Sequence, residues 1–168
     1  IRELTIEGSN RSFDQVQCLG LSVIDEDIAA LCASLTKTAK DNAEDPTKIR
    51  TVTEKHLLQW GVLCEQDGTL APTNAYAILT GNEAVRSVVQ CGVFKGTTKA
   101  VFVDRREFTG TPQELIEESY QYVLRNIHMG ARFRGVYRQD VYEIPPDAIR
   151  ELIVNAIVHR SYIDHSSI

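Results

Sequence analysis

The sequence has few of the residues that mark specialised architectures. Ten glycines and five prolines in 168 residues exclude collagen-like and low-complexity chains. No apolar run approaches the 18 residues of a membrane-spanning helix, so we expect no membrane partner. The 23 acidic residues outnumber the 18 basic ones, for a net charge of −5. This balance argues against a protein that coats nucleic acid by bulk charge, and any such contact must come from a local patch.

Cysteine motifs are also absent. Cys18, Cys32, Cys64 and Cys91 form no Cys-x-x-Cys pair, which argues against zinc and dithiol redox sites. We expect four reduced thiols, mostly in the core, in a cytoplasmic protein.

Several catalytic motifs are missing as well. The sequence has no Gly-x-Ser-x-Gly elbow, no P-loop and no cysteine with an evident base. His159, Asp164 and His165 lie close together in the sequence, but their spacing matches no helical pair of metal ligands. We therefore expect neither a nucleophilic hydrolase nor a structural metal site.

The pattern that is present predicts a mixed fold, α/β or α+β, with helices and short strands. In the first half, apolar residues at i, i+3, i+4 and i+7 from Ile28 predict a helix that begins at Asp25. The polar stretch 37–44 breaks this pattern. Asp45 and Pro46 then predict the cap and first residue of a short helix that carries Ile49 and Val52.

Residues 53–81 predict a compact series of elements. Thr53 begins a helix that ends at Gly61, two short strands surround a turn at Asp67 and Gly68, and another helix ends at Gly81. Two short helices followed by a hairpin have the general shape of a winged helix. Its second helix is not strongly basic, and winged helices also serve in packing and dimerisation.

The second half begins with a predicted hairpin over 87–94 and 99–104. Thr111 and Glu114 match a capping box, and the helix they open has a periodic apolar face. That face consists of Ile116, Tyr120, Val123, Leu124 and Ile127. Residues 132–144 are predicted to be extended, and a last helix is predicted from Pro145 to His159.

The last helix is the most informative segment. It is apolar almost all round, which predicts burial, yet Glu151, Asn155 and His159 recur at i, i+4 and i+8 on one face. A buried carboxylate and amide need partners. One interpretation is that the stripe meets solvent or bonds a neighbouring strand. The other is that its oxygens face a ligand that carries a hard cation such as Mg²⁺.

The segment 151–156, E-L-I-V-N-A, resembles the N-box of the GHKL ATPases, the superfamily of gyrase B, MutL and the histidine kinases. In that superfamily the N-box asparagine coordinates Mg²⁺ bound to ATP, and in the hydrolysing members the glutamate activates water. The resemblance implies ATP and Mg²⁺ as cofactors. By position it implies a catalytic role for Glu151, Mg²⁺ coordination by Asn155, and nucleotide binding by Asn155 and His159.

A wider match covers residues 12–162. Residues 150–162 resemble the pattern R-E-x-x-x-N-A-x-x-H-R-x-Y of a bacterial and archaeal family described as transcriptional regulators or RecG-related ATP-dependent DNA helicases. Residues 70–81, 91–97 and 104–110 resemble its L-T-N-A-G-x-L-L-F-G, A-x-F-K-G-T and D-x-x-x-F-x-G segments. The family resembles a layout with an AlbA-type N-terminal domain and a GHKL-like ATPase domain.

That layout implies boundaries along this chain. We expect residues 1–11 to be the tail of the AlbA-type domain, 12–82 to be the winged-helix-like segment, and 83–168 to begin the GHKL-like domain. The family often has Asp at the place of Ser161, and its Asp-x-Gly-x-Gly motif, which reads adenine, is absent here. We therefore expect this chain to be the central part of a longer protein and not to bind ATP tightly by itself.

A basic segment offers a second candidate site. Arg132, Arg134 and Arg138 share one parity in the predicted strand, and no acidic residue occurs between Arg125 and Arg138. Three arginines on one face can follow a phosphate backbone. The alternative is a solvated edge strand whose charges prevent aggregation.

Basic residues of the preceding hairpin extend this patch if the fold brings them together. They are Lys95, Lys99, Arg105 and Arg106.

Taken together, the sequence and the resemblance predict a DNA-associated regulator or helicase-related protein that carries half of an ATP–Mg site. Its partners are then DNA and a second copy of itself. Two other interpretations stay open: a non-catalytic dimerisation module with a vestigial ATPase fold, and a nucleic-acid-binding module that uses the arginine strand.

Overall fold

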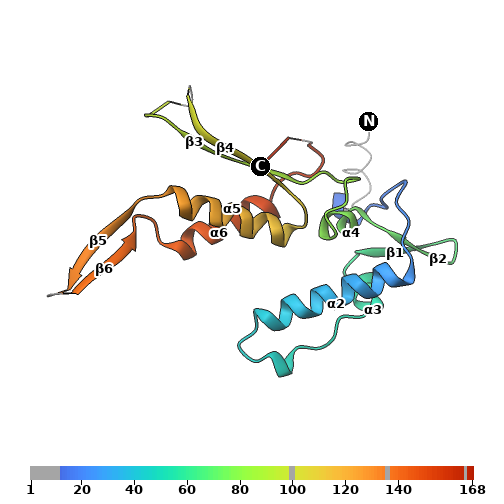
Figure 1. The fold of residues 1–168 in the computed structure, drawn as a ribbon. Helices are drawn as coiled ribbons and strands as arrows, with labels where there is room; N and C mark the ends of the chain where they lie inside the picture. Colours follow the sequence, from blue (N-terminus) through green and yellow to red (C-terminus); the bar gives the residue numbers. More distant parts are fainter. Residues whose placement is uncertain (1–11, 99–100, 135–136, 165) are drawn as a thin grey trace. The chain divides into compact units, whose positions relative to one another are not determined.

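The computed structural model describes residues 12–98, 101–134, 137–164 and 166–168 (Figure 1). The chain divides into two units between Val85 and Arg86. Both units combine helices with small antiparallel sheets, so the predicted mixed α+β class is confirmed. Among the described residues, no helix is both long enough and apolar enough to cross a membrane. The tail predicted at residues 1–11 lies outside the described residues.

The first unit consists of short helices and one hairpin. Its elements are η1 (Phe13–Gln15), α2 (Asp25–Asp41), η2 (Pro46–Lys48), α3 (Glu54–Gln59), β1 (Leu63–Gln66), β2 (Thr69–Pro72) and α4 (Asn74–Leu79). An isolated antiparallel bridge joins Gln17 to Thr73. The segment before α2 therefore lies beside the end of the hairpin.

The predicted elements of residues 53–81 are confirmed. Thr53 and His56 form a capping box at the start of α3, and Gly61 follows its end with a φ of +73°. In the turn between β1 and β2, Asp67 has a φ of 51° and Gly68 a φ of 78°. Positive φ at both central residues is typical of the two-residue turns whose twist suits a hairpin.

Two predictions for residues 37–52 are wrong. Helix α2 continues through the polar stretch to Asp41, since polar helix formers on its solvent side do not interrupt a helix. The helix predicted to carry Ile49 and Val52 is only the short η2. The amide of Val52 instead donates to the buried Thr36 hydroxyl at 2.9 Å, which holds this segment extended.

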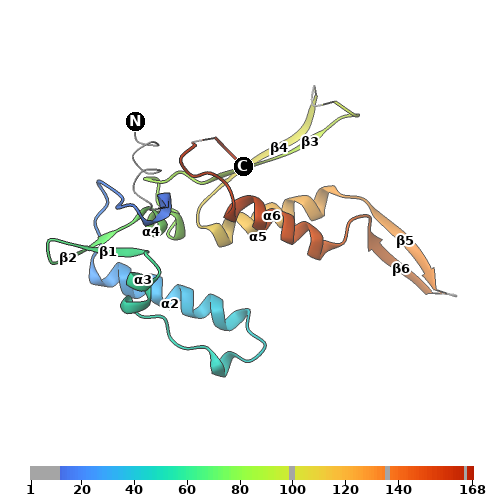
Figure 2. The ribbon, with the colours of Figure 1, turned by 180° about the vertical axis from the view of Figure 1, so that it is seen from behind.

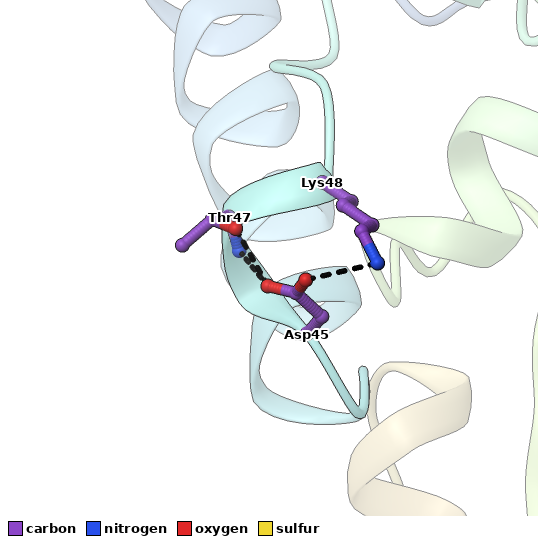
Figure 3. A network of polar contacts seen from close by, with 3 residues as sticks. All are labelled: Asp45, Thr47 and Lys48. Carbon is purple, nitrogen blue, oxygen red and sulfur yellow. Dashed lines mark hydrogen bonds and ion pairs between the residues drawn. The ribbon is translucent and has the colours of Figure 1, made fainter.

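The cap of η2 is correctly predicted. The Asp45 carboxylate accepts hydrogen bonds from the amide and hydroxyl of Thr47, at 3.1 and 2.6 Å, and lies 3.1 Å from the Lys48 ammonium (Figure 3). These contacts lower the pKa of Asp45, the Thr47 hydroxyl first. All of them lie within four residues, so the carboxylate stabilises a single turn without extending it.

A buried threonine joins the parts of the first unit. Thr73 is fully buried, and its hydroxyl lies 2.7 Å from the carbonyl of Gly61 and 2.9 Å from that of Val62. Its amide also donates to Val62, and its carbonyl accepts from Ala77 in α4. One residue therefore links the end of α3, the two strands and α4. The apolar core beside it consists of Ile28, Leu31, Leu57, Val62, Leu63 and Tyr76.

Replacement of Thr73 by valine should destabilise the first unit by about 1–3 kcal/mol, because the variant keeps the shape but leaves a buried carbonyl without its donor. Trp60 is the single tryptophan of the chain, so its fluorescence in a urea titration reports on this unit. Thr73→Ser, which keeps the hydroxyl, should lose less than half as much. Equal midpoints for the valine variant and the wild type would contradict the role of this hydroxyl.

The second unit has two hairpins and two long helices. Its elements are β3 (Val88–Phe94), β4 (Phe102–Thr109), α5 (Pro112–Asn126), β5 (Met129–Arg134), β6 (Tyr137–Tyr142) and α6 (Pro146–Val158). Helices α5 and α6 lie side by side, and the β5–β6 ribbon extends from one end of this pair (Figures 1 and 2). The core consists of Val89, Leu115 and Ile157, flanked by Cys91, Phe108, Ile116, Ile153 and Ile168.

Helix α5 begins at the predicted capping box. The amide of Glu114 donates to the Thr111 hydroxyl, and the Glu114 carboxylate accepts from the Thr111 amide at 2.8 Å. The predicted apolar face is only half-buried, whereas the fully buried positions are Leu115, Ser119 and Tyr122. The prediction missed this face because it counted only apolar residues, and Ser119 is polar. Helix α5 thus has one side on the β3–β4 sheet and an adjacent side toward α6.

Residues 132–144 do not form the one extended segment that was predicted. The structure places a hairpin here, in which β5 and β6 are antiparallel with Arg132 opposite Gln139 and Arg134 opposite Tyr137. The ladder continues at its base, where the amide of Glu143 donates to the carbonyl of His128 at 3.1 Å. The single-strand prediction failed because the sequence has no strong turn signal between the two strands.

Candidate functional site

Helix α6 carries the predicted polar stripe on its solvent side. Glu151, Asn155 and His159 are all exposed, and they lie one turn apart, with His159 as the C-terminal cap residue. Within the described part of the chain, no hydrogen bond or ion pair of these three side chains is found. The stripe is thus available to a ligand.

The prediction that α6 is buried all round is wrong for the part of the molecule that the structure describes. Ile149 and Ile157 are buried and Ile153 is half-buried, but Leu152 is 67% exposed and Val158 59% exposed. Only the side toward α5 and β3 is covered. The polar stripe therefore lies on an open face between two exposed apolar side chains.

The chemistry of the stripe suits a cation that arrives with its own ligands. Glu151 and Asn155 supply a carboxylate and an amide oxygen, both of which are ligands for hard cations. Among the described residues, no group of three His, Cys, Asp or Glu side chains is placed to hold a metal ion by itself. Mg²⁺ in proteins typically uses one or two protein ligands together with substrate phosphates and water. The donor set thus fits a magnesium–polyphosphate complex better than a bare ion.

The segment after α6 is held by an arginine and a tyrosine. The Arg160 guanidinium donates to the carbonyls of Asp164 and Ser166, at 3.0 and 2.8 Å, and stacks on the Tyr162 ring at 4.7 Å. The Tyr162 hydroxyl donates to the carbonyl of Ile157 at 3.0 Å, and burial raises the pKa of this tyrosine. The segment is therefore tied back to the end of the helix that bears the stripe.

This segment ends as a strand partner of β3. The amide of Ile168 donates to the carbonyl of Val88, and the amide of Gln90 donates to the carbonyl of Ile168, both at 2.9 Å. Bonds from one residue to both neighbours of Val89 are the pattern of a parallel pair. Ile168 also packs against the core of the second unit, so α6 is followed by a return to the sheet.

The three arginines of the second candidate site do not share one face of a single strand. Arg132 and Arg134 lie in β5, whereas Arg138 lies in β6 opposite Phe133. Directly opposed residues in an antiparallel pair share a face, so Arg138 belongs to the face opposite that of Arg132 and Arg134. The parity argument failed because the chain reverses between Arg134 and Tyr137.

Two basic residues of the β3–β4 hairpin have acidic neighbours. Arg105 lies 3.5 Å from Glu107 and Arg106 lies 3.9 Å from Asp104. As successive strand residues, the two arginines also point to opposite faces. Lys99 lies outside the described residues. A continuous basic patch over this hairpin is therefore not formed by the two arginines.

Helix α3 presents a mixed surface. Glu54, Lys55 and Gln59 are exposed, while His56 is engaged in the capping box. Trp60 is 53% exposed, with its ring centroid 5.7 Å from that of His56. Sequence reasoning took Trp60 only as the end of the helix, and the signal that it missed is an aromatic residue just before a helix-ending glycine.

The four cysteines are all unpaired. Burial raises the pKa of the thiols of Cys18, Cys32 and Cys91. A raised pKa disfavours the thiolate, which is the nucleophilic form. These three side chains therefore act as small apolar groups in the structure.

Comparison with known proteins gave no match: no family model matches the chain, and no curated protein or solved structure matches it significantly.

Replacement of Arg160 by alanine should release the segment that follows α6, because two carbonyls lose their donor and Tyr162 loses its stacked cation. The amide of Gln90 reports on this change, since its acceptor is the carbonyl of Ile168. Hydrogen exchange followed by NMR should show faster exchange of this amide in the variant. Arg125→Ala, which removes an exposed arginine of α5, is the control. Unchanged protection of Gln90 in Arg160→Ala would show that the guanidinium does not hold this segment.

Proposed function

We propose that α6 forms one wall of a GHKL-like Mg–ATP site in a DNA-associated regulator or RecG-related helicase-like protein. The observation that carries this proposal is the stripe of Glu151 and Asn155, exposed and without side-chain partners in the described residues, on a helix whose other side is anchored in the core. Exposure of a carboxylate and an amide on an ordered helix is what a ligand-facing wall requires.

Each residue of the stripe has a distinct task in this site. The amide oxygen of Asn155 binds the Mg²⁺ that accompanies the phosphates, and the Glu151 carboxylate accepts a proton from the attacking water. His159, at the end of the stripe, contacts the nucleotide. The Mg²⁺ neutralises charge that develops on the phosphates.

The adenine half of the site belongs to a segment that this chain does not contain. The resemblance implies an Asp-x-Gly-x-Gly motif for that half, and no such motif occurs in the sequence. ATP and Mg²⁺ are therefore cofactors of the full-length protein, and binding by this chain alone should be too weak to measure. The element order of the first unit, with a bridge strand, two helices and a hairpin, supports a winged helix that precedes the ATP module.

Isothermal titration of the full-length protein with Mg–ATP tests this function. Asn155→Ala should lose Mg–ATP binding, and Glu151→Gln should bind but hydrolyse at least about 100-fold more slowly, the lower range for loss of a general base. Glu118→Gln, on the exposed side of α5, is a matched control that should change neither property.

Two results would overturn the ATP site. One is unchanged Mg–ATP binding in Asn155→Ala. The other is the absence of binding by the wild type together with a dimer that dissociates when the exposed Leu152 is replaced by aspartate, which would favour the dimerisation module.

The β5–β6 hairpin is a second candidate, for nucleic-acid binding. Its two-stranded ladder extends from the helix pair (Figure 1), and the sequence places three arginines and one acid, Asp140, on these strands. A two-stranded ribbon is a known shape for insertion into the major groove. Arginines on both faces of the ribbon suit contact with phosphates on both sides of such a groove.

Replacement of Arg134 by alanine should weaken binding of duplex DNA and lower the slope of log K against log salt by about one unit, as expected for loss of one phosphate contact. Fluorescence anisotropy over a range of salt concentrations measures both quantities. Arg86→Ala removes the same charge from an exposed position outside the ribbon and should leave the slope unchanged. Equal slopes for Arg134→Ala and the wild type would remove the ribbon from the DNA interface.

A further inference from the structure

Arg150 immediately precedes the polar stripe and connects α6 to α5. Its guanidinium lies 2.8 Å from the Glu117 carboxylate and 4.2 Å over the centre of the Tyr120 ring. Glu117 also accepts a hydrogen bond from Gln121 at 2.9 Å. The guanidinium thus has a carboxylate and an aromatic face of the same helix as partners.

The remaining contacts between α6 and the rest of the unit are apolar. Ile149, Ile153 and Ile157 lie on one side of the helix, toward the core. Apolar packing is not directional and resists rotation of a helix about its axis less sharply than an ion pair does. Arg150 lies about 100° around the helix from Ile149 and about 100° from Glu151. It is therefore placed between the buried side and the stripe.

The rotation of α6 decides where the stripe presents its oxygens. A helix with side chains has a radius of about 5–6 Å, so a rotation of about 20° moves a side-chain tip by about 2 Å. Functional groups must be held within about 0.5 Å of their working position. A contact that limits rotation by even this amount is therefore relevant to metal coordination by Asn155.

We propose that Arg150, held between Glu117 and Tyr120, is a positioning residue that sets the rotation of α6 and thereby aims Asn155 at the magnesium of a bound nucleotide. This inference rests on the proposed function. Arg150 does not touch the ligand, because its guanidinium is directed to α5. A lysine at this position has a single ammonium group and lacks the planar fork that contacts a carboxylate and a ring together.

The experiment separates the magnesium-dependent part of nucleotide binding from the rest. ATP affinity of the full-length protein is measured by titration in excess Mg²⁺ and again in EDTA. Variants are Arg150→Ala, Arg150→Lys, Asn155→Ala and, as a matched control on α5, Glu118→Ala. In the wild type, Mg²⁺ should strengthen binding.

In Arg150→Ala the strengthening by Mg²⁺ should fall about three- to tenfold, the size expected for loss of an exposed ion pair together with a cation–π contact. Affinity in EDTA should stay unchanged, which a variant that merely destabilises the fold does not achieve. Arg150→Lys should restore part of the effect, Asn155→Ala should remove it completely, and Glu118→Ala should leave it intact.

The outcomes distinguish the two claims. If wild-type protein binds ATP with a magnesium effect that Arg150→Ala leaves intact, the positioning role is wrong and the site stands. An equal loss in Mg²⁺ and in EDTA shows that Arg150 acts on the fold as a whole and likewise overturns the positioning role. If the wild type binds ATP in neither buffer, the proposed function is wrong, and the role of Arg150 in it is overturned as well.

Discussion

The packing of one side of α6 against α5 and β3 is the contact on which the arrangement of the second unit depends. Ile157 is fully buried beside Leu115 and Val89, and this cluster joins a helix from the end of the chain to a strand more than 60 residues earlier. Because the covered side of α6 is apolar, its polar residues are placed on the open side. The same packing brings Arg150 to Glu117 and leads the following segment back to the edge of β3.

The first unit depends on a different kind of contact. Thr73 joins its parts through backbone carbonyls and its own hydroxyl, in a fully buried position. Buried polar groups stabilise a fold only when they are satisfied, and here a single hydroxyl serves two carbonyls at the end of α3. The hairpin and the helices of this unit therefore form one cooperative structure around a polar junction as well as an apolar core.

Exposure changes how the last helix is interpreted. A sequence that is apolar almost all round suggests a buried helix, but Leu152 and Val158 are largely exposed within the described residues. Burial of a carboxylate and an amide would need compensating partners. The open stripe requires none, which is why it supports a ligand-facing role better than a structural one. The same stripe beside exposed apolar side chains is also compatible in chemistry with an interface, and the proposed experiments separate these two uses.

The sequence alone determined most of the local structure. The capping pairs Thr53–His56 and Thr111–Glu114, the turn at Asp67 and Gly68, and the start of α6 all follow from interactions within a few residues, which a sequence pattern can display. The stripe of Glu151, Asn155 and His159 is likewise a matter of helical period. The family resemblance, and with it the proposed roles of these residues, also came from the sequence.

Only the tertiary structure decided which faces are covered. The buried side of α5, the separation of Arg138 from Arg132 and Arg134, the pairing of Ile168 with β3 and the contact of Arg150 with Glu117 and Tyr120 all join elements that lie apart in the chain. Burial and strand register depend on which surfaces meet, and periodicity within one segment does not contain that information.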